Sequence, residues 1–196
     1  MKVVIIKYNA GNIKSVLFAL ERIGVNAIVT DDIDEIRSAD KVIFPGVGEA
    51  SSAMQYLKEK GLDKLICSLT QPVLGICLGM QLMCTHSEEN DTLCMGIFPE
   101  KVVRFSESNG LKIPQIGWNN ITDLKSKLFA GIPENAYMYF VHSYYVECSG
   151  DTISTTDYTQ KYSSALQKNN FYAVQFHPEK SGEVGQRILE NFINNI

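Results

Sequence analysis

One stretch near the middle of the sequence decides the fold of this chain: Pro72-Val73-Leu74-Gly75-Ile76-Cys77-Leu78-Gly79-Met80-Gln81. Its apolar run, Val73 to Ile76, is typical of a buried strand, and the segment that starts at Met80 is typical of a helix. Cys77 lies between them, with a glycine two residues away on each side. The stretch therefore predicts a nucleophile elbow, a strand, sharp turn and helix, with cysteine in place of serine.

The two flanking glycines have a steric reason. A turn that holds its central residue in a strained conformation leaves little room for neighbouring Cβ atoms, and Gly75 and Gly79 relieve that crowding. The thiol then stands at the start of a helix, where unpaired N–H groups and the helix dipole favour the thiolate. The alternative is a buried structural cysteine at a strand end, as many free cysteines are. The paired glycines favour a catalytic Cys77.

Length and composition limit the possible classes of protein. A chain of 196 residues is long enough for one well-buried core, and we predict a single domain over residues 1–196. The net charge of −4, without a Lys/Arg-rich block, argues against nucleic acid or a membrane surface as a partner. The five cysteines form no C-x-x-C pair, which argues against a disulfide framework or zinc site and fits a reducing cytoplasm.

Strands and helices alternate over the first half of the sequence. The expected strands are Val3–Ile6, Ala27–Thr30, Lys41–Phe44 and Val73–Ile76. The expected helices are Ile13–Ile23, a short helix that is capped by Asp31 or Asp32 and reaches Ala39, and Ala50–Leu69 with an interruption near Gly61. This alternation predicts a largely parallel sheet with helices on both faces.

The second half is dominated by extended segments. They are expected at Lys101–Phe105, Gly117–Ile121, Ala136–Glu147, Thr152–Thr156, Ser163–Gln167 and Phe171–Phe176. Asn169 and Asn170 can supply the positive φ angles of a hairpin turn between the last two. A final helix is expected at Val184–Ile193. The fold class predicted is a three-layer α/β protein with an open, largely parallel sheet, antiparallel additions and helices on both faces.

Functional loops in such a fold lie beyond the carboxyl ends of the parallel strands. Four segments qualify and should converge on one crevice: Asn9–Asn12, Pro45–Gly48, the Cys77 elbow and the segment after Phe176. The first of them lacks the G-x-G-x-x-G fingerprint, so a dinucleotide is not indicated. We expect neither a cofactor nor a metal.

The segment after Phe176 supplies a candidate base, His177, and a candidate carboxylate, Glu179. Residues two apart on an extended chain project to the same side, so the two side chains can meet if the chain stays extended through Pro178. An imidazole can take the thiol proton and later protonate a leaving amine. A carboxylate fixes its tautomer and supports its charge. The alternative is a surface turn with a solvated glutamate.

The two other histidines are weaker candidates for the base. His86 is expected on the elbow helix, about 13–14 Å from Cys77 at the helical rise, too far to act on the thiol. His142 lies at a strand or strand end and is expected to be a core residue or a substrate contact.

Attack on a carbonyl creates an oxyanion, which backbone N–H groups can stabilise. The expected donors are the amide that follows the nucleophile, Leu78, and one from the glycine-flanked loop, Val47 or Gly48. The glycines of that loop also let a peptide plane turn at low cost, which would permit an inactive resting state. The alternative is a simple strand-ending turn.

The elbow, Gly75 to Gln81, together with His177-Pro178-Glu179 resembles the triad-type, class I glutamine amidotransferases. Within that group the sequence is similar to the glutaminase subunits of imidazole glycerol phosphate synthases. The stretches that carry this closer resemblance are Tyr8–Asn12, Pro45–Gly48, Pro114–Asn119, His142–Tyr144 and His177–Gly182. The resemblance extends from the first strand to the last helix.

The resemblance implies hydrolysis of glutamine to glutamate and ammonia through a thioester on Cys77. It implies that His177 is base and then acid, that Glu179 orients it, and that Gly48 and Leu78 lie near the oxyanion. It places Gln81 and the backbone of His142, Ser143 and Tyr144 around glutamine. It also implies a heterodimer with a (β/α)8-barrel cyclase, which uses the ammonia to make imidazole glycerol phosphate and an aminoimidazole carboxamide ribotide in histidine biosynthesis.

Three other functions are alternatives for this sequence. The first is a glutaminase that serves another acceptor, such as pyridoxal phosphate synthase or a paralogous synthase; Gly117–Asn119 and Pro45–Gly48 argue against the former. The second is a cysteine-dependent peptidase or esterase, which would turn over substrates without a partner. The third is a non-catalytic regulatory subunit, against which the intact Cys77, His177 and Glu179 argue.

Overall fold

The computed structural model describes residues 1–9, 11–106 and 110–196. The first half contains β1 (Val3–Ile6), α1 (Ile13–Arg22), β2 (Ala27–Thr30), α2 (Ile33–Arg37), β3 (Lys41–Gly46), α3 (Ala50–Glu59), α4 (Leu62–Ser68), β4 (Val73–Cys77) and α5 (Leu78–Met83). The second half contains β5 (His86–Ser87), β6 (Thr92–Leu93), β7 (Lys101–Arg104), β8 (Gln115–Ile121), β9 (Ala136–His142), β10 (Tyr144–Val146), β11 (Thr152–Asp157), β12 (Lys161–Lys168), β13 (Phe171–Val174) and α6 (Gly182–Asn195), with three short 3-10 helices, η1 (Glu89–Asp91), η2 (Lys127–Phe129) and η3 (Pro178–Lys180).

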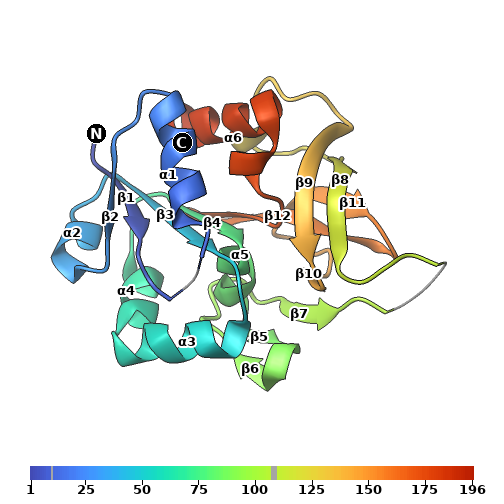
Figure 1. Ribbon diagram of the computed structural model, residues 1–196, viewed down its shortest axis with the longest axis horizontal. Coiled ribbons are helices and arrows are strands. Elements are labelled where there is room, and N and C mark those ends of the chain that lie inside the picture. Colours follow the sequence, from blue (N-terminus) through green and yellow to red (C-terminus); the bar gives the residue numbers. More distant parts are fainter. Residues whose placement is uncertain (10, 107–109) are drawn as a thin grey trace.

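The centre of the molecule is a mixed sheet whose parallel part has the strand order β2-β1-β3-β4-β13. Side chains alternate between its two faces, so Val4 and Ile6 enter one core while Val3 and Ile5 enter the other. Helices α3, α4 and α5 cover the first face, and α1 and α6 cover the second (Figure 1). This three-layer arrangement confirms the predicted fold class.

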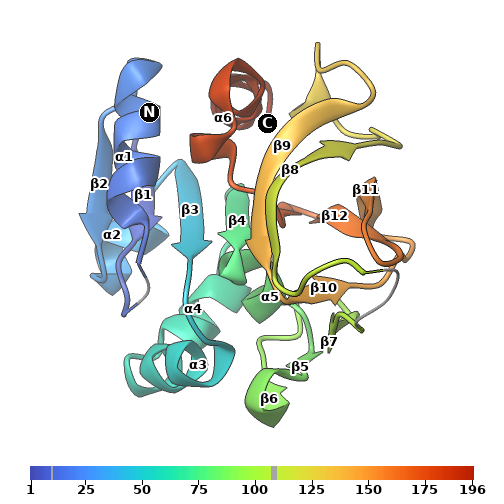
Figure 2. The ribbon, with the colours of Figure 1, turned by 45° about the vertical axis from the view of Figure 1, so that its right-hand side comes forward.

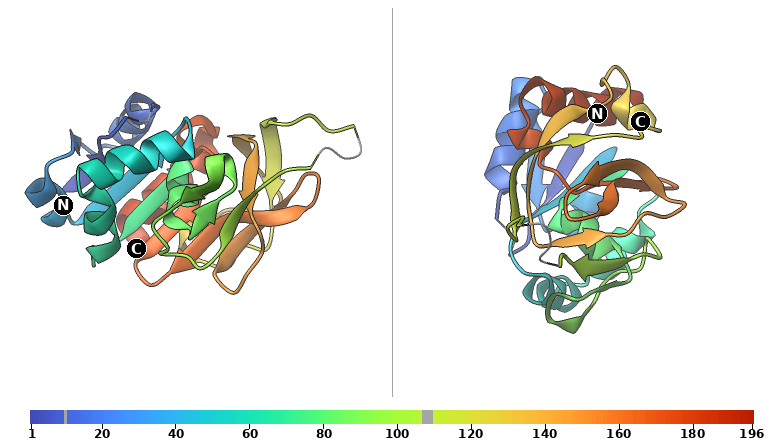
Figure 3. Two further views of the ribbon diagram at one scale, coloured as in Figure 1. Left: turned by 90° about the horizontal axis from the view of Figure 1, so that it is seen from below. Right: turned by 90° about the vertical axis from the view of Figure 1, so that its right-hand side faces the viewer.

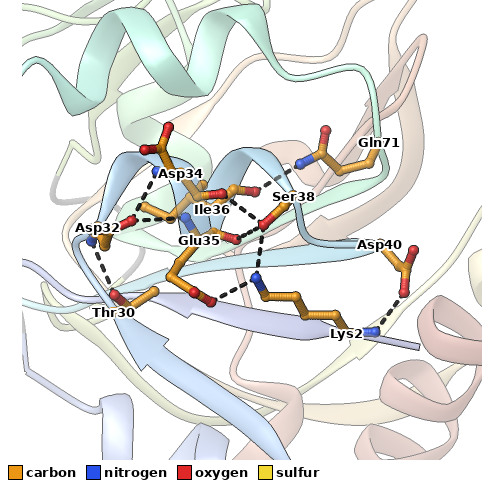
Figure 4. Close-up of polar contacts among 9 residues, drawn as sticks. All are labelled: Lys2, Thr30, Asp32, Asp34, Glu35, Ile36, Ser38, Asp40 and Gln71. Carbon is orange, nitrogen blue, oxygen red and sulfur yellow. Dashed lines mark hydrogen bonds and ion pairs between the residues drawn. The ribbon is translucent and has the colours of Figure 1, made fainter.

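Polar contacts hold α2 at the edge of the sheet near the N-terminus (Figure 4). The Asp32 carboxylate accepts hydrogen bonds from the N–H groups of Asp34 and Glu35, at 3.0 and 2.9 Å. It therefore caps α2, which confirms one of the two predicted caps. Lys2 reaches the other end of this helix, where its Nζ donates to Ser38 Oγ at 2.8 Å.

The sheet continues beyond β13 as antiparallel strands. Strand β12 pairs with β13 through the turn at Asn169, whose φ is 54° as the predicted hairpin requires. Strand β12 also pairs with β11 and β10, and β10 pairs with β7. Seen from below, α3 lies across the side nearest the viewer, and the antiparallel strands extend to its right (Figure 3).

The prediction of one extended segment over Ala136–Glu147 was wrong. The chain breaks at Ser143: β9 pairs with β8 in a separate two-stranded sheet, and β10 returns to the main sheet. The break is held by His142, whose Nδ1 donates to the Tyr144 carbonyl at 2.7 Å. Figure 2 shows β8 and β9 as a curved ribbon in front of the main sheet.

The prediction that His86 lies on the elbow helix was also wrong. Helix α5 ends at Met83, and His86 starts the short strand β5, which pairs with β6 and β7. Its Nε2 lies 2.8 Å from Asp91 Oδ1, on the surface. The helix ends before Cys84, where the backbone becomes extended with ψ −179°.

Candidate active site

Cys77 is the last residue of β4 and the residue that precedes α5, as the elbow pattern predicts. Its backbone angles, φ 55° and ψ −109°, lie outside the regions that residues other than glycine normally adopt. A Cβ on Gly79 would lie 1.9 Å from the Phe44 carbonyl oxygen, and one on Gly75 would lie 3.1 Å from the backbone of Met80. Close packing of α5 on β3 therefore requires Gly79, and close packing of α5 on β4 favours Gly75.

Strand β3 brings the second candidate loop to the nucleophile. It extends to Gly46, beyond the predicted end at Phe44, and Gly46 is paired with Cys77 in the sheet. Val47 and Gly48 follow, and with Leu78 they line a cavity of about 280 Å³ that opens at Cys77. Backbone N–H groups at these three positions are therefore candidates to stabilise an oxyanion on a carbonyl attacked by the thiol.

His177 and Glu179 lie together in the interior beside this cavity. Their side chains are fully buried, and His177 Nδ1 is 2.7 Å from Glu179 Oε1. The expected condition for this contact, an extended chain through Pro178, is not met. The chain instead turns into η3, where Lys180 N–H donates to the His177 carbonyl at 3.0 Å. Proline suits this first helical position because it needs no N–H donor there.

The electrostatic environment of His177 favours its protonated form. Burial lowers the pKa of this imidazole, but the negative charge of a Cys77 thiolate and the Glu179 carboxylate raise it, to a net value of about 10. Nδ1 is engaged by Glu179, whereas Nε2 is buried without a hydrogen-bond partner among the described residues, which leaves it for the thiol. An imidazolium at this position can support attack by the sulfur and then protonate a leaving group.

Asn12 is a site residue that the sequence analysis did not single out, although its loop was expected in the crevice. Its backbone is left-handed, with φ 73°. Its Nδ2 donates to Glu179 Oε1 and lies 3.4 Å from His177 Nδ1. The signal available in the sequence was the Gly11-Asn12 pair, since asparagine tolerates positive φ better than most residues. Asn12 therefore holds the carboxylate that holds the imidazole.

Gln175 was also missed. It is fully buried and donates from Nε2 toward Cys77 Sγ at 3.7 Å. Its Oε1 accepts from Gln81 Nε2 at 2.9 Å, and Gln81 also donates to the Tyr144 carbonyl at 3.1 Å. This chain of amides links the sulfur to the backbone of Tyr144 in the cavity lining. Gln175 lies two residues before His177, so the alternation of an extended chain could have indicated it.

The cavity lining also contains the remaining predicted residues. Gln81, His142, Ser143 and Tyr144 all line it. Burial lowers the pKa of His142 to about 4, so this imidazole is neutral and is no rival to His177 as the base. Glu89, which was not predicted, is the one carboxylate in the lining formed by the described residues, and its Oε2 accepts from the Ala50 N–H at 2.8 Å.

The described residues contain no group of three or more His, Cys, Asp or Glu side chains placed to hold a metal ion. They also contain no helix with the length and apolar content needed to cross a bilayer. The chemistry that the site offers is covalent catalysis on a carbonyl compound, because the nucleophile lines a small cavity and the buried His177–Glu179 pair can supply a base.

Comparison with known proteins places the whole chain in one family. The family model described as Glutamine amidotransferase class-I matches residues 4–196. The imidazole glycerol phosphate synthase subunit HisH of Bacteroides fragilis is 58% identical over 194 residues, which are 98% of this chain and 99% of that protein. The HisH subunit of Haemophilus influenzae is 45% identical over 100% of this chain and 98% of its own length. A solved structure of PurLQS from Thermotoga maritima has a TM-score of 0.73 at 16% identity, covers 99% of this chain and 98% of its own, and supports the fold alone.

Proposed function

Because the chain belongs to the class I glutamine amidotransferases, we propose that it hydrolyses the side-chain amide of glutamine and passes the ammonia to the cyclase of an imidazole glycerol phosphate synthase. The observation that carries this proposal is the placement of Cys77 at the strained elbow, beside the buried His177–Glu179 pair and a cavity with one carboxylate. The near full-length HisH relatives support the same acceptor pathway, histidine biosynthesis.

The reaction follows from the geometry in two halves. The Cys77 thiolate attacks the amide carbon, and the oxyanion forms beside the N–H groups of Leu78 and of Val47 or Gly48. His177 Nε2–H gives its proton to the amide nitrogen, so ammonia leaves and a thioester remains on the sulfur. Water then attacks the thioester while His177 takes its proton, and glutamate departs as Cys77 is restored.

The cavity wall offers groups for the other end of glutamine. The Glu89 carboxylate suits the α-ammonium of an amino acid, and burial of Glu89, which raises its pKa, makes a cationic partner favourable there. Gln81, Ser143 and Tyr144 also line the cavity and can contact the rest of glutamine. The cavity volume of about 280 Å³ lies just below the range typical of sites for drug-sized ligands. This volume suits a ligand as small as a single amino acid.

We further propose that the partner is a (β/α)8-barrel cyclase and that the two chains form a cytoplasmic heterodimer. Released ammonia would be wasted in water, so a docked acceptor is physically sensible. The candidate docking face lies on β8 and β9, where Ile116, Trp118 and Tyr137 are 63%, 56% and 61% exposed. This face continues into the site, because Val141 on the same side of β9 lines the cavity.

The test is a pair of assays on the complex of this chain with the cyclase. Cys77→Ala should abolish synthesis from glutamine and leave synthesis from added ammonia intact, because only the first needs the nucleophile. Cys148→Ala, at an exposed free cysteine, should leave both activities unchanged. Loss of both activities in a folded, docked Cys77→Ala complex would contradict the division of labour. Turnover of esters or peptides by the chain alone would instead favour a peptidase or esterase.

A further inference from the structure

The hydroxyl group of Tyr8 is buried and unpaired. Tyr8 follows β1, its side chain is 5% exposed, and its ring packs on Phe44 with centroids 5.2 Å apart. Within the part of the chain that the structure describes, its hydroxyl oxygen has no hydrogen-bond partner. A buried hydroxyl without a partner lowers stability, typically by about 1–3 kcal/mol, so this group calls for an explanation other than packing.

The position of the hydroxyl is informative. A Cβ built on Gly46 would lie 2.1 Å from the Tyr8 oxygen and 3.1 Å from Leu78 Cβ. The hydroxyl therefore lies against the backbone where the Val47–Gly48 loop leaves β3, next to the first residue of α5. These are the two segments that carry the candidate oxyanion donors. The same contact explains why position 46 must be glycine.

Peptide geometry connects this hydroxyl to the oxyanion. The Gly46 carbonyl and the Val47 N–H belong to one planar trans peptide, so they point in opposite directions. When the Val47 N–H faces the cavity, where it can stabilise the oxyanion, the Gly46 carbonyl must face away from the cavity. Gly46 is buried, so a carbonyl turned inward loses water and needs a donor within the protein.

We propose that the Tyr8 hydroxyl donates a hydrogen bond to the Gly46 carbonyl when the Val47 N–H faces the oxyanion, so that Tyr8 is a positioning residue for catalysis. This inference rests on the proposed function, and it adds a residue that does not touch glutamine. When the Val47 N–H faces away from the cavity, the Tyr8 hydroxyl stays unpaired, which raises the free energy of that orientation. The loop is therefore biased toward the orientation in which the Val47 N–H faces the oxyanion.

The chemistry of Tyr8 fits a permanent donor. Burial, and then the negative charge at Cys77, raise the pKa of its hydroxyl far above the ordinary value, so the proton stays on the oxygen at any working pH. Phenylalanine would retain the ring and its contact with Phe44 but would lose this proton. Tyr8→Phe therefore separates the role of the hydroxyl from the role of the ring.

The experiment compares Tyr8→Phe with Tyr172→Phe in the complex with the cyclase. The Tyr172 hydroxyl accepts a hydrogen bond from Gln167 Nε2 at 3.3 Å, on β13 and away from the cavity. Tyr8→Phe should lower kcat for glutamine about three- to tenfold, the range of one hydrogen bond, with KM and ammonia-dependent synthesis unchanged. Its melting temperature should equal or exceed that of the wild type. Tyr172→Phe should lower the melting temperature slightly and leave kcat unchanged.

The opposite movement of stability and turnover is what distinguishes positioning from packing. An unchanged kcat in Tyr8→Phe would overturn the inference, and so would a loss of kcat together with a lower melting temperature. Failure of the wild-type complex to release glutamate from glutamine would overturn the proposed function itself, and the role of Tyr8 with it.

Discussion

The carboxylate of Glu179 gives the sharpest prediction, because one of its oxygens serves two donors. His177 Nδ1–H and Asn12 Nδ2 both donate to Oε1. The other oxygen, Oε2, has no hydrogen-bond partner among residues 1–9, 11–106 and 110–196. A glutamine at this position can therefore place its amide oxygen at the Oε1 position and its amide nitrogen at the Oε2 position without losing an existing hydrogen bond.

We expect Glu179→Gln to remove the charge but keep the tautomer of His177. A hydrogen bond to a charged group contributes about 1.5–3 kcal/mol and a neutral one about 0.5–1.5 kcal/mol. The loss of charge should then cost about 1–2 kcal/mol, which is about a 5- to 30-fold decrease in kcat for glutamine. The reverse amide orientation is disfavoured because its NH2 group would face the Asn12 NH2 group.

Asn12→Ala should change the outcome of Glu179→Gln. Without Asn12, the amide can turn and present NH2 to His177 Nδ1, which selects the tautomer with the proton on Nε2. That tautomer cannot accept the thiol proton, and the equivalent error in a serine protease triad costs about 10⁴-fold in kcat. The double variant should therefore lose about 10³- to 10⁴-fold, well beyond the product of the single losses if Asn12→Ala alone costs about three- to tenfold.

The measurement is glutamate release by the four complexes of the double-mutant cycle, at saturating cyclase and glutamine. Ammonia-dependent synthesis by the same samples reports whether the chain is folded and docked. A loss near 10⁴-fold in Glu179→Gln alone, with no further loss on adding Asn12→Ala, would refute the reasoning, since Asn12 would then not hold the amide.

Further expectations concern the elbow, the buried base and the docking face. Gly79→Ala should lower the free energy of unfolding by about 3 kcal/mol or more, because the new Cβ would meet the Phe44 carbonyl. The control is Gly150→Ala, since a Cβ at position 150 would enter open space. It should change the free energy of unfolding by less than about 0.5 kcal/mol in denaturant titrations. Since the pKa of His177 is raised to about 10 in the folded chain, its protonation stabilises the fold fully below its ordinary pKa of about 6.5, and this contribution is lost as the pH rises toward 10. The stability advantage of the wild type over His177→Gln should therefore shrink between pH 7 and 10 in urea titrations, and an advantage that grows would contradict the assignment. Trp118→Ala should weaken binding to the cyclase about 30-fold in calorimetry, without altering the melting temperature of the free chain.

Several elements could be predicted because their causes are local. The alternation of apolar runs and helical periodicity gave the parallel strands and the helices that cover them. The left-handed turn at Asn169 and the cap at Asp32 follow from side chains that act within three residues. The elbow was readable for the same reason, since Gly75 and Gly79 are needed by the turn that they flank.

Other features could not be predicted because they depend on which segments meet. Nothing within Ala136–Glu147 indicates that β9 pairs with β8 while β10 joins the main sheet; that division depends on partners more than ten residues away. The end of α5 could not be predicted for the same reason. Residues after Met83 are compatible with a helix, yet strand pairing places His86 in β5.

The sequence by itself determined the nucleophile, its strained turn and the order of strands and helices, because these arise from steric and hydrogen-bonding preferences of neighbouring residues. Only the tertiary structure decided that Asn12 holds Glu179, that Gln175 reaches the sulfur and that Tyr8 lies under Gly46. These contacts join residues between 38 and 167 positions apart. Side-chain chemistry tells which groups need a partner, but the sheet register and the helix packing tell which partner they meet.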